Sequence, residues 1–87
     1  GELISKKYNL EYGSSELSIQ KKINIADKNV VLIDDLLATG GTLKCAEELI
    51  AMSNGNVVAS LVIVELTKLS GSLLLKNPVH SLVKYDE

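Results

Sequence analysis

The sequence predicts an α/β fold, namely a mostly parallel sheet built around one βαβ unit. Two short apolar runs rich in β-branched residues, at positions 30–33 and 57–64, are typical of strands buried on both faces of a parallel sheet. Between them, residues 42–52 place apolar side chains at helical spacing. A strand, a helix and a second strand in this order predict a right-handed crossover with the two strands parallel.

The composition describes one globular unit spanning residues 1–87, with a formal net charge of −2 and 46% hydrophobic residues. Nine basic and eleven acidic residues are scattered without a basic stripe, which argues against nucleic-acid binding. The apolar run at 57–64 is far shorter than the ~20 residues of a membrane span, and no signal peptide is recognisable. We therefore expect a cytoplasmic protein that does not bind membranes.

The N-terminal part predicts two strands joined by a turn. Residues 2–10 alternate loosely between apolar and polar side chains, as an edge strand or hairpin arm does. Residues 11–15 carry turn chemistry, and Leu17, Ile19 and Ile23 then indicate a second, half-buried strand.

Two acids and a glycine pair follow the strand at 30–33. Asp34 and Asp35 are expected at the carboxyl end of this strand, and a glycine-centred loop then leads into the helix. Backbone N–H groups and two hydroxyls can converge there on an anion at the helix N-terminus. The candidate anion-binding residues are Ala38, Thr39, Gly40, Gly41 and Thr42.

Carboxylates repel a phosphate at close range unless a neutral or cationic group separates them. A ribose is such a spacer, because its hydroxyls donate hydrogen bonds to carboxylates while its phosphate reaches the loop. The pattern therefore suits a phosphorylated sugar. The simpler alternative is that Asp34 and Asp35 are polar strand-end residues and the glycine pair is an ordinary turn.

The helix should bury one stripe and end at a clear stop signal. Its apolar stripe consists of Leu43, Ala46, Leu49 and Ile50, and its more polar faces carry Lys44, Glu47 and Glu48. Cys45 is the single cysteine of the chain, which leaves no disulfide framework and suggests a buried structural thiol. Asn54 and Gly55 form the stop signal.

The strand at 57–64 leads to Glu65 and Leu66 at the same sheet edge as the acid pair, so Leu66 can form a wall beside a ligand or be an ordinary core leucine. Residues 69–76 suggest one short helix, Asn77-Pro78 a turn, and residues 80–83 a final strand. His80 has no second ligand at metal-binding spacing, so no metal site is predicted there.

The segment Asp-Asp-Leu-Leu-Ala-Thr-Gly-Gly-Thr at 34–42 resembles the phosphoribosyl-pyrophosphate (PRPP) motif of type I phosphoribosyltransferases. The sequence of this segment is similar to the corresponding motif of the adenine-specific members of that family. Leu-Glu-Tyr-Gly at 10–13 and Val-Glu-Leu-Thr at 64–67 agree with the same group, so the resemblance covers nearly the whole chain. One departure is the largely apolar Ser-Leu-Leu-Leu at 72–75, where the family usually carries charged residues.

The resemblance implies a partial Rossmann-like domain that converts adenine and PRPP to AMP and pyrophosphate in purine salvage. Asp34 and Asp35 would bind the ribose hydroxyls and favour a cationic transition state, and residues 38–42 would bind the 5'-phosphate. Leu66 would pack on adenine, and Glu11 would contact the base or assist proton transfer, although residue chemistry alone favours a solvated turn acid for Glu11. Mg2+ would arrive with the pyrophosphate, and a homodimer is implied.

The family places its adenine-gripping segment and its pyrophosphate-covering loop upstream of the part matched here. We therefore expect an incomplete domain that carries the sugar-phosphate half of the site and turns over little unless supplemented. Two alternatives stay open. One is a non-catalytic module that senses PRPP or a nucleotide with the same fold, and the other is a phosphoribosyltransferase for another base.

Overall fold

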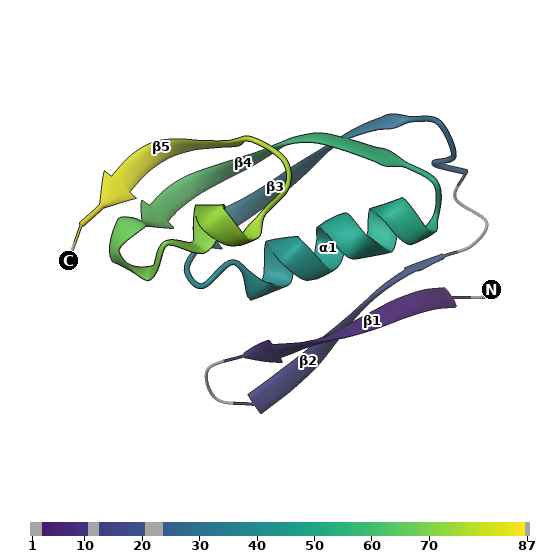
Figure 1. Cartoon of the computed structure of the whole chain (residues 1–87), viewed down its shortest axis with the longest axis horizontal. Coiled ribbons are helices and arrows are strands. Elements are labelled where there is room, and N and C mark those ends of the chain that lie inside the picture. The colour runs from purple at the N-terminus through teal and green to yellow at the C-terminus, as the bar shows by residue number, and fades with distance from the viewer. Residues whose placement is uncertain (1–2, 11–12, 21–23, 87) are drawn as a thin grey trace.

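The computed structural model describes the backbone of residues 3–10, 13–20 and 24–86 and the side chains of residues 24–86 (Figure 1). Its elements are β1 (Leu3–Leu10), β2 (Gly13–Gln20), β3 (Asn29–Leu37), α1 (Gly41–Met52), β4 (Asn56–Leu66), the 3-10 helices η1 (Thr67–Leu69) and η2 (Gly71–Leu74), and β5 (Val79–Tyr85). β1 and β2 pair antiparallel as a hairpin, which confirms the two N-terminal strands. The hairpin lies against α1.

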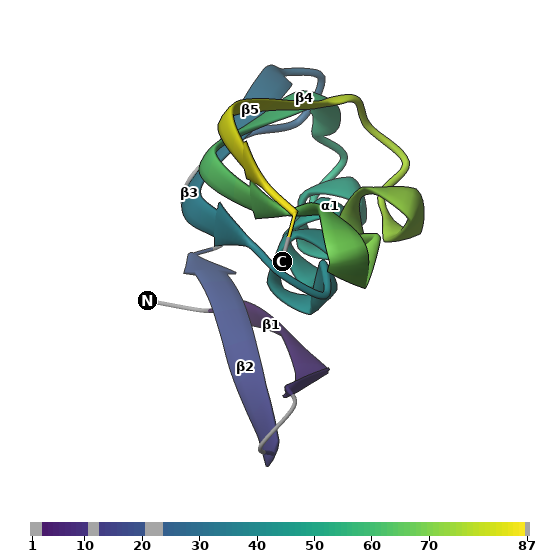
Figure 2. The same ribbon diagram turned by 90° about the vertical axis from the view of Figure 1, so that its left-hand side faces the viewer.

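The predicted parallel βαβ unit is confirmed. β3, β4 and β5 form a three-stranded sheet in that order, and both strand pairs are parallel (Figure 2). α1 connects β3 to β4 and begins at Gly41, one residue before the predicted start. Because all three strands run the same way, their carboxyl ends meet at one edge of the sheet, where the loop before α1 also lies.

α1 covers one face of this sheet, and the core lies between them. Leu37, Leu43 and Val62 form the buried cluster, with Leu32, Leu75 and Val79 packed against it. On β4 the inward Val62 is 3% exposed, whereas its neighbours Leu61 and Ile63 are 43% and 53% exposed. The described part of the chain therefore buries β3 and β4 on one face only.

The stop signal of α1 acts as predicted. Asn54 adopts a left-handed conformation with a φ of 64°. Its N–H donates to the Ala51 carbonyl at 3.0 Å, and the N–H of Gly55 donates to the Ile50 carbonyl at 2.9 Å. This pair of bonds is the Schellman arrangement that ends many helices. Of the described helices, none has the length and apolar character needed to cross a membrane.

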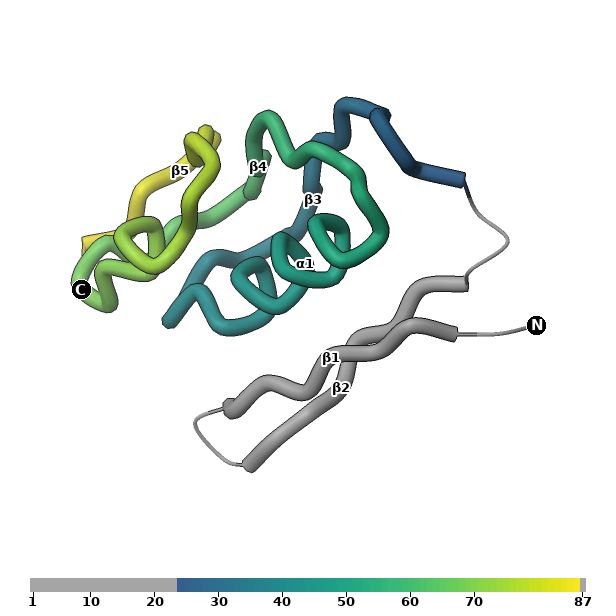
Figure 3. Tube along the Cα trace, turned by 45° about the vertical axis from the view of Figure 1, so that its right-hand side comes forward, coloured from purple at the N-terminus to yellow at the C-terminus, as the bar shows by residue number. Residues whose placement is uncertain are grey.

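The connection from β4 to β5 differs from the prediction. The expected single helix at 69–76 is wrong, because η1 and η2 are two short 3-10 turns separated by Ser70 in the left-handed region at a φ of 53°. A continuous helix would need an apolar stripe to bury, yet Leu73 is 84% exposed. The trace in Figure 3 shows this connection passing beside the start of α1. β5 then extends the predicted strand at both ends.

Candidate functional site

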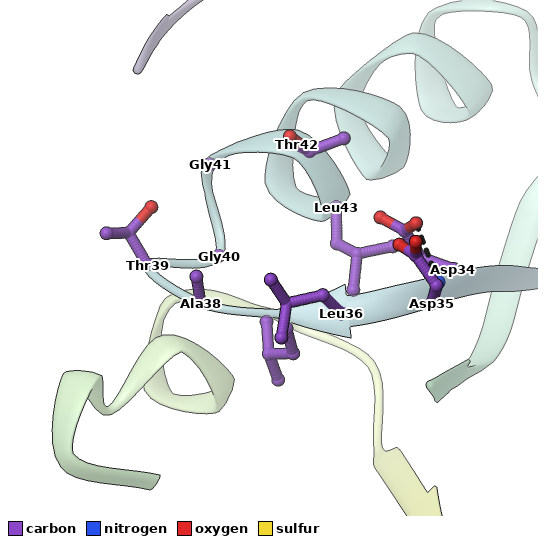
Figure 4. A pocket seen from close by; sticks show the side chains of 10 residues that line it. Asp34, Asp35, Leu36, Ala38, Thr39, Gly40, Gly41, Thr42 and Leu43 are labelled. Atoms are coloured by element: carbon purple, nitrogen blue, oxygen red, sulfur yellow. Dashed lines mark hydrogen bonds between the residues drawn. The ribbon is translucent and has the colours of Figure 1, made fainter. Parts of the chain in front are cut away.

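Ten consecutive residues, 34–43, line a hollow of about 380 Å³ at the carboxyl edge of the sheet (Figure 4). It spans the last part of β3, the loop and the first turn of α1. The acids Asp34 and Asp35 lie at one end of the close view and Thr39 at the other. Every predicted residue of the sugar-phosphate set therefore lines one concave surface.

The loop end of the hollow presents backbone donors. Gly40 precedes α1 with a φ of 91°, a conformation that glycine adopts without a steric penalty. The helix ladder begins with the Lys44 N–H donating to the Gly40 carbonyl at 2.8 Å. The N–H groups before it have no acceptor within the helix, no side chain caps them, and the first turn carries no acid. Partial positive charge thus gathers where an anion can approach.

Two buried leucines fix this loop in place. Leu37 ends β3 at 1% exposure and Leu43 opens α1 at 4% exposure, and both belong to the same core cluster. The short loop between them is therefore anchored on both sides by packing. Gly40 itself is buried, whereas Gly41 and Thr42 are half-buried and Thr39 is exposed.

The acid pair does not lie at the end of its strand, so that expectation is corrected. β3 continues past the acids, with Leu36 opposite Val64 and Leu37 opposite Glu65 in the parallel ladder. The reason is the burial of Leu37, which extends the strand into the core beyond the polar pair. Asp34 and Asp35 consequently sit on a regular strand next to the loop.

The carboxyls of the pair interact electrostatically. The backbone N–H of Asp35 donates to Oδ1 of Asp34 at 2.8 Å. Burial raises the pKa of the Asp34 carboxyl above its ordinary value, and the charge and side chain of Asp35 raise it further, against the opposing effect of that backbone hydrogen bond. A cationic or hydroxyl-rich group placed here would relieve this cost.

The remaining predicted residues are not brought into the hollow. Leu66 is the last residue of β4 and half-buried, and it is not among the lining residues. Glu11 lies outside the described residues. His80 is exposed on β5. Over the range 24–86, no three His, Cys, Asp or Glu side chains are grouped so as to hold a metal ion. Cys45 is buried, as predicted.

Sequence reasoning missed two contributors to the framework of the site. Glu47 was expected on a polar face of the helix, but it is 7% exposed and accepts hydrogen bonds from the connection before β5. Its spacing of four from Leu43 could have indicated an inward position. Gly71 packs against the back of the loop between Leu37 and Leu43, and no local pattern in the sequence indicates that contact.

Comparison with known proteins gives a consistent result. Residues 3–85 match the phosphoribosyl transferase domain family. The chain is 49% identical over 85 residues to an adenine phosphoribosyltransferase of Prochlorococcus marinus strain MIT 9312, covering 98% of this chain and 50% of that relative. The chain thus spans about half the length of the curated relatives it matches.

Two solved structures show the same arrangement. Adenine phosphoribosyltransferase from Thermoanaerobacter pseudethanolicus superposes with a TM-score of 0.90 at 39% identity, over 97% of this chain and 49% of that one. The Saccharomyces cerevisiae enzyme was crystallised with an imino-altritol 1,6-bisphosphate and adenine. It superposes with a TM-score of 0.89 at 38% identity, over 94% of this chain and 47% of that one.

Proposed function

The chain belongs to the phosphoribosyltransferase domain family, and from this premise we propose that it carries the ribose-5-phosphate half of a site that makes AMP and pyrophosphate from adenine and PRPP. The single observation that carries the proposal is the hollow itself. One continuous stretch, residues 34–43, lines it with two carboxylates beside an uncapped helix N-terminus. A phosphorylated sugar complements both features at once.

The loop would bind the 5'-phosphate. Its free N–H groups at the start of α1 can donate to phosphate oxygens, and the left-handed Gly40 lets the backbone turn towards them. The hydroxyls of Thr39 and Thr42 belong to the same lining and can add further donors. The yeast enzyme, whose matching half superposes on this chain, binds a bisphosphorylated iminosugar, which supports a sugar-phosphate ligand.

The acids would bind the ribose and stabilise the charge that develops on it. As the C1–O bond to pyrophosphate breaks and the bond from C1 to the adenine nitrogen forms, positive charge spreads over C1 and the ring oxygen. Two carboxylates nearby stabilise that positive charge. The interaction should be stronger for Asp34 than for a fully exposed acid, because burial disfavours the charged Asp34 carboxylate until a positive charge lies beside it. The remaining contribution is positioning of the ribose by its hydroxyls and phosphate.

Mg2+ would enter with the pyrophosphate of PRPP and offset its charge against the acid pair. Mg2+ prefers oxygen ligands and commonly binds through substrate phosphates with only one or two carboxylates. The carboxylates of Asp34 and Asp35 are of that type, and residues 24–86 group no larger acidic set around them. With no larger acidic set among those residues to hold it, Mg2+ would depend mainly on the pyrophosphate oxygens, and the acids would hold the ribose hydroxyls.

Adenine would lie beyond the sugar, towards the end of β4. Leu66 ends that strand at the same sheet edge as the hollow, which supports an apolar contact with the base. Glu11 is proposed to assist removal of the adenine proton, on the resemblance of its segment alone. Base selection thus depends on residues outside the hollow, and the sugar-phosphate contacts do not.

Titration of the 87-residue chain with ribose 5-phosphate, followed by backbone amide NMR shifts, tests the proposal. We expect the largest shifts at residues 39–43, with a smaller set at Asp34 and Asp35, and no such pattern with ribose alone. Ribose 5-phosphate shifts confined to other parts of the chain would contradict it. If adenine and PRPP are then added, formation of AMP would exclude a sensing module, since such a module would bind PRPP without forming AMP.

A further inference from the structure

We propose that Gly71 is a positioning residue for the phosphate loop, acting through direct backbone contact from behind the site. The inference rests on the proposed function and deepens it. It assigns the connection between β4 and β5 a specific task, which is to set the position of residues 38–40. Gly71 touches none of the expected ligand atoms.

The evidence is the absence of space at Gly71. A Cβ built there would overlap the carbonyl oxygen of Ala38 and would lie 3.0 Å from the Gly40 nitrogen and 3.0 Å from the Thr39 carbonyl carbon. The contact is mutual, since a Cβ at Gly40 would lie 2.6 Å from the Gly71 carbonyl oxygen. Two backbones therefore meet with no side chain between them, and Gly71 is buried.

Conformation alone does not call for glycine at this position. Among the described glycines only Gly40 has a positive φ, so the backbone of Gly71 is open to any L-residue. What excludes a larger residue is the loop itself. All of the nearest atoms are backbone atoms, which cannot rotate away as the end of a side chain can.

The far end of the same connection is fastened to α1. The buried carboxylate of Glu47 accepts the N–H of Lys76 at 3.0 Å, the N–H of Asn77 at 2.8 Å and the side-chain amide of Asn77. Leu75 packs against the cluster that contains Leu37 and Leu43. The end of the connection that leads into β5 is thus held to both the helix and the core, which supports the contact at Gly71.

Because the clash is between two backbones, an added methyl group at residue 71 must displace one of them, and the attachments of the connection at residues 75–77 direct that displacement to the loop. Hydrogen bonds from N–H groups weaken steeply when distance and angle depart from their narrow range. A displacement large enough to relieve the overlap with the Ala38 carbonyl, shared by several donors, should therefore lower phosphate affinity at least tenfold, an order-of-magnitude expectation from losing one to two charge-assisted bonds.

Gly71→Ala is tested against Gly55→Ala as a matched control. A Cβ at Gly55 is also crowded, at 2.7 Å from the Ile50 side chain, but it lies at the opposite end of α1. In ligand-free protein we expect amide shift changes at residues 38–41 for Gly71→Ala and none there for Gly55→Ala. Ribose 5-phosphate should bind at least tenfold more weakly to Gly71→Ala and equally well to the control.

A second variant covers the case in which Gly71→Ala does not fold. Glu47→Gln weakens the attachment of Lys76 and Asn77, and shifts should then spread from residues 71–77 to residues 38–40. Shifts that stop at residue 71, or a Gly71→Ala loop indistinguishable from that of the control, would overturn the inference. If the parent chain does not bind ribose 5-phosphate, the proposed function is overturned instead. The amide shift changes between the ligand-free parent and its variants then still test the role of Gly71.

Discussion

The two ends of the hollow are built by different means. The loop end consists of backbone donors held by packing, with Leu37 and Leu43 buried on either side and Gly71 behind. The acid end consists of two side chains on a regular strand, where Asp34 is half-buried and Asp35 exposed. Geometry therefore depends on the core at one end, and electrostatics dominates at the other. Substitutions should separate these contributions.

The largest effect is expected where the loop meets the core. Leu37→Ala should lower the free energy of unfolding by about 2–5 kcal/mol, because it leaves a cavity between β3 and α1. Its neighbour Leu36 lines the same hollow but is 43% exposed, so Leu36→Ala should cost about 1 kcal/mol or less. Urea unfolding of both variants measures the difference. Equal losses would mean that the loop end is not anchored by the core.

The second prediction separates the contribution of the loop N–H donors to ligand binding from any effect on folding. Gly41→Val places a branched side chain at the mouth of the loop and should weaken ribose 5-phosphate binding by about 100-fold or more, through loss of several donors. Ala51→Val is the matched control, because it places the same branched side chain on the exposed side of the same helix. Calorimetric titration beside a thermal melt checks it. Unchanged affinity in Gly41→Val would remove the loop from the site.

The acid end should show a smaller, charge-dependent effect. Asn keeps the size of Asp and still accepts a hydroxyl hydrogen bond, but it lacks the charge that favours a cationic sugar. Replacing Asp34 or Asp35 should raise the reaction barrier by about 1–3 kcal/mol, or roughly one to two decades in rate.

Single-turnover formation of AMP at saturating PRPP measures this loss, in whatever protein context supports turnover. Asp27→Asn is the control, since Asp27 is an exposed acid in a left-handed turn that Asn also tolerates. Parent rates in both acid-pair variants would make the pair structural and would remove its charge from the account of catalysis.

The same division explains what the sequence could predict. Periodicity located β3, α1 and β4, since each buries a regular stripe, and the turn chemistry of Asn54 marked the helix end. The motif placed the whole hollow, because its lining is contiguous in sequence. Contacts between distant segments were out of reach. Glu47 bonds to residues about thirty positions away, and Gly71 meets the loop only through the fold.

The smallest effect concerns pH and the acid end alone. Burial raises the pKa of the folded Asp34 carboxyl above the unfolded value of about 3.9. Between those two pKa values the folded state binds more protons than the unfolded state, so stability falls as pH rises through that window and is constant above it. Asp34→Asn removes the cost of the charged form, so at pH 7 it should be at least as stable as the parent while binding PRPP less productively.

Urea unfolding at a series of pH values between 3 and 7 should therefore show the parent losing stability relative to Asp34→Asn as pH rises through the carboxyl range. Asp35→Asn sharpens the test. This variant removes the neighbouring charge that contributes to the raised pKa of Asp34. An NMR titration should then show the pKa of the Asp34 carboxyl closer to its ordinary value but still above it, because burial remains. A parent that gains stability over Asp34→Asn with rising pH would show that the acid end stabilises the fold, and the contrast between the two ends would then fail.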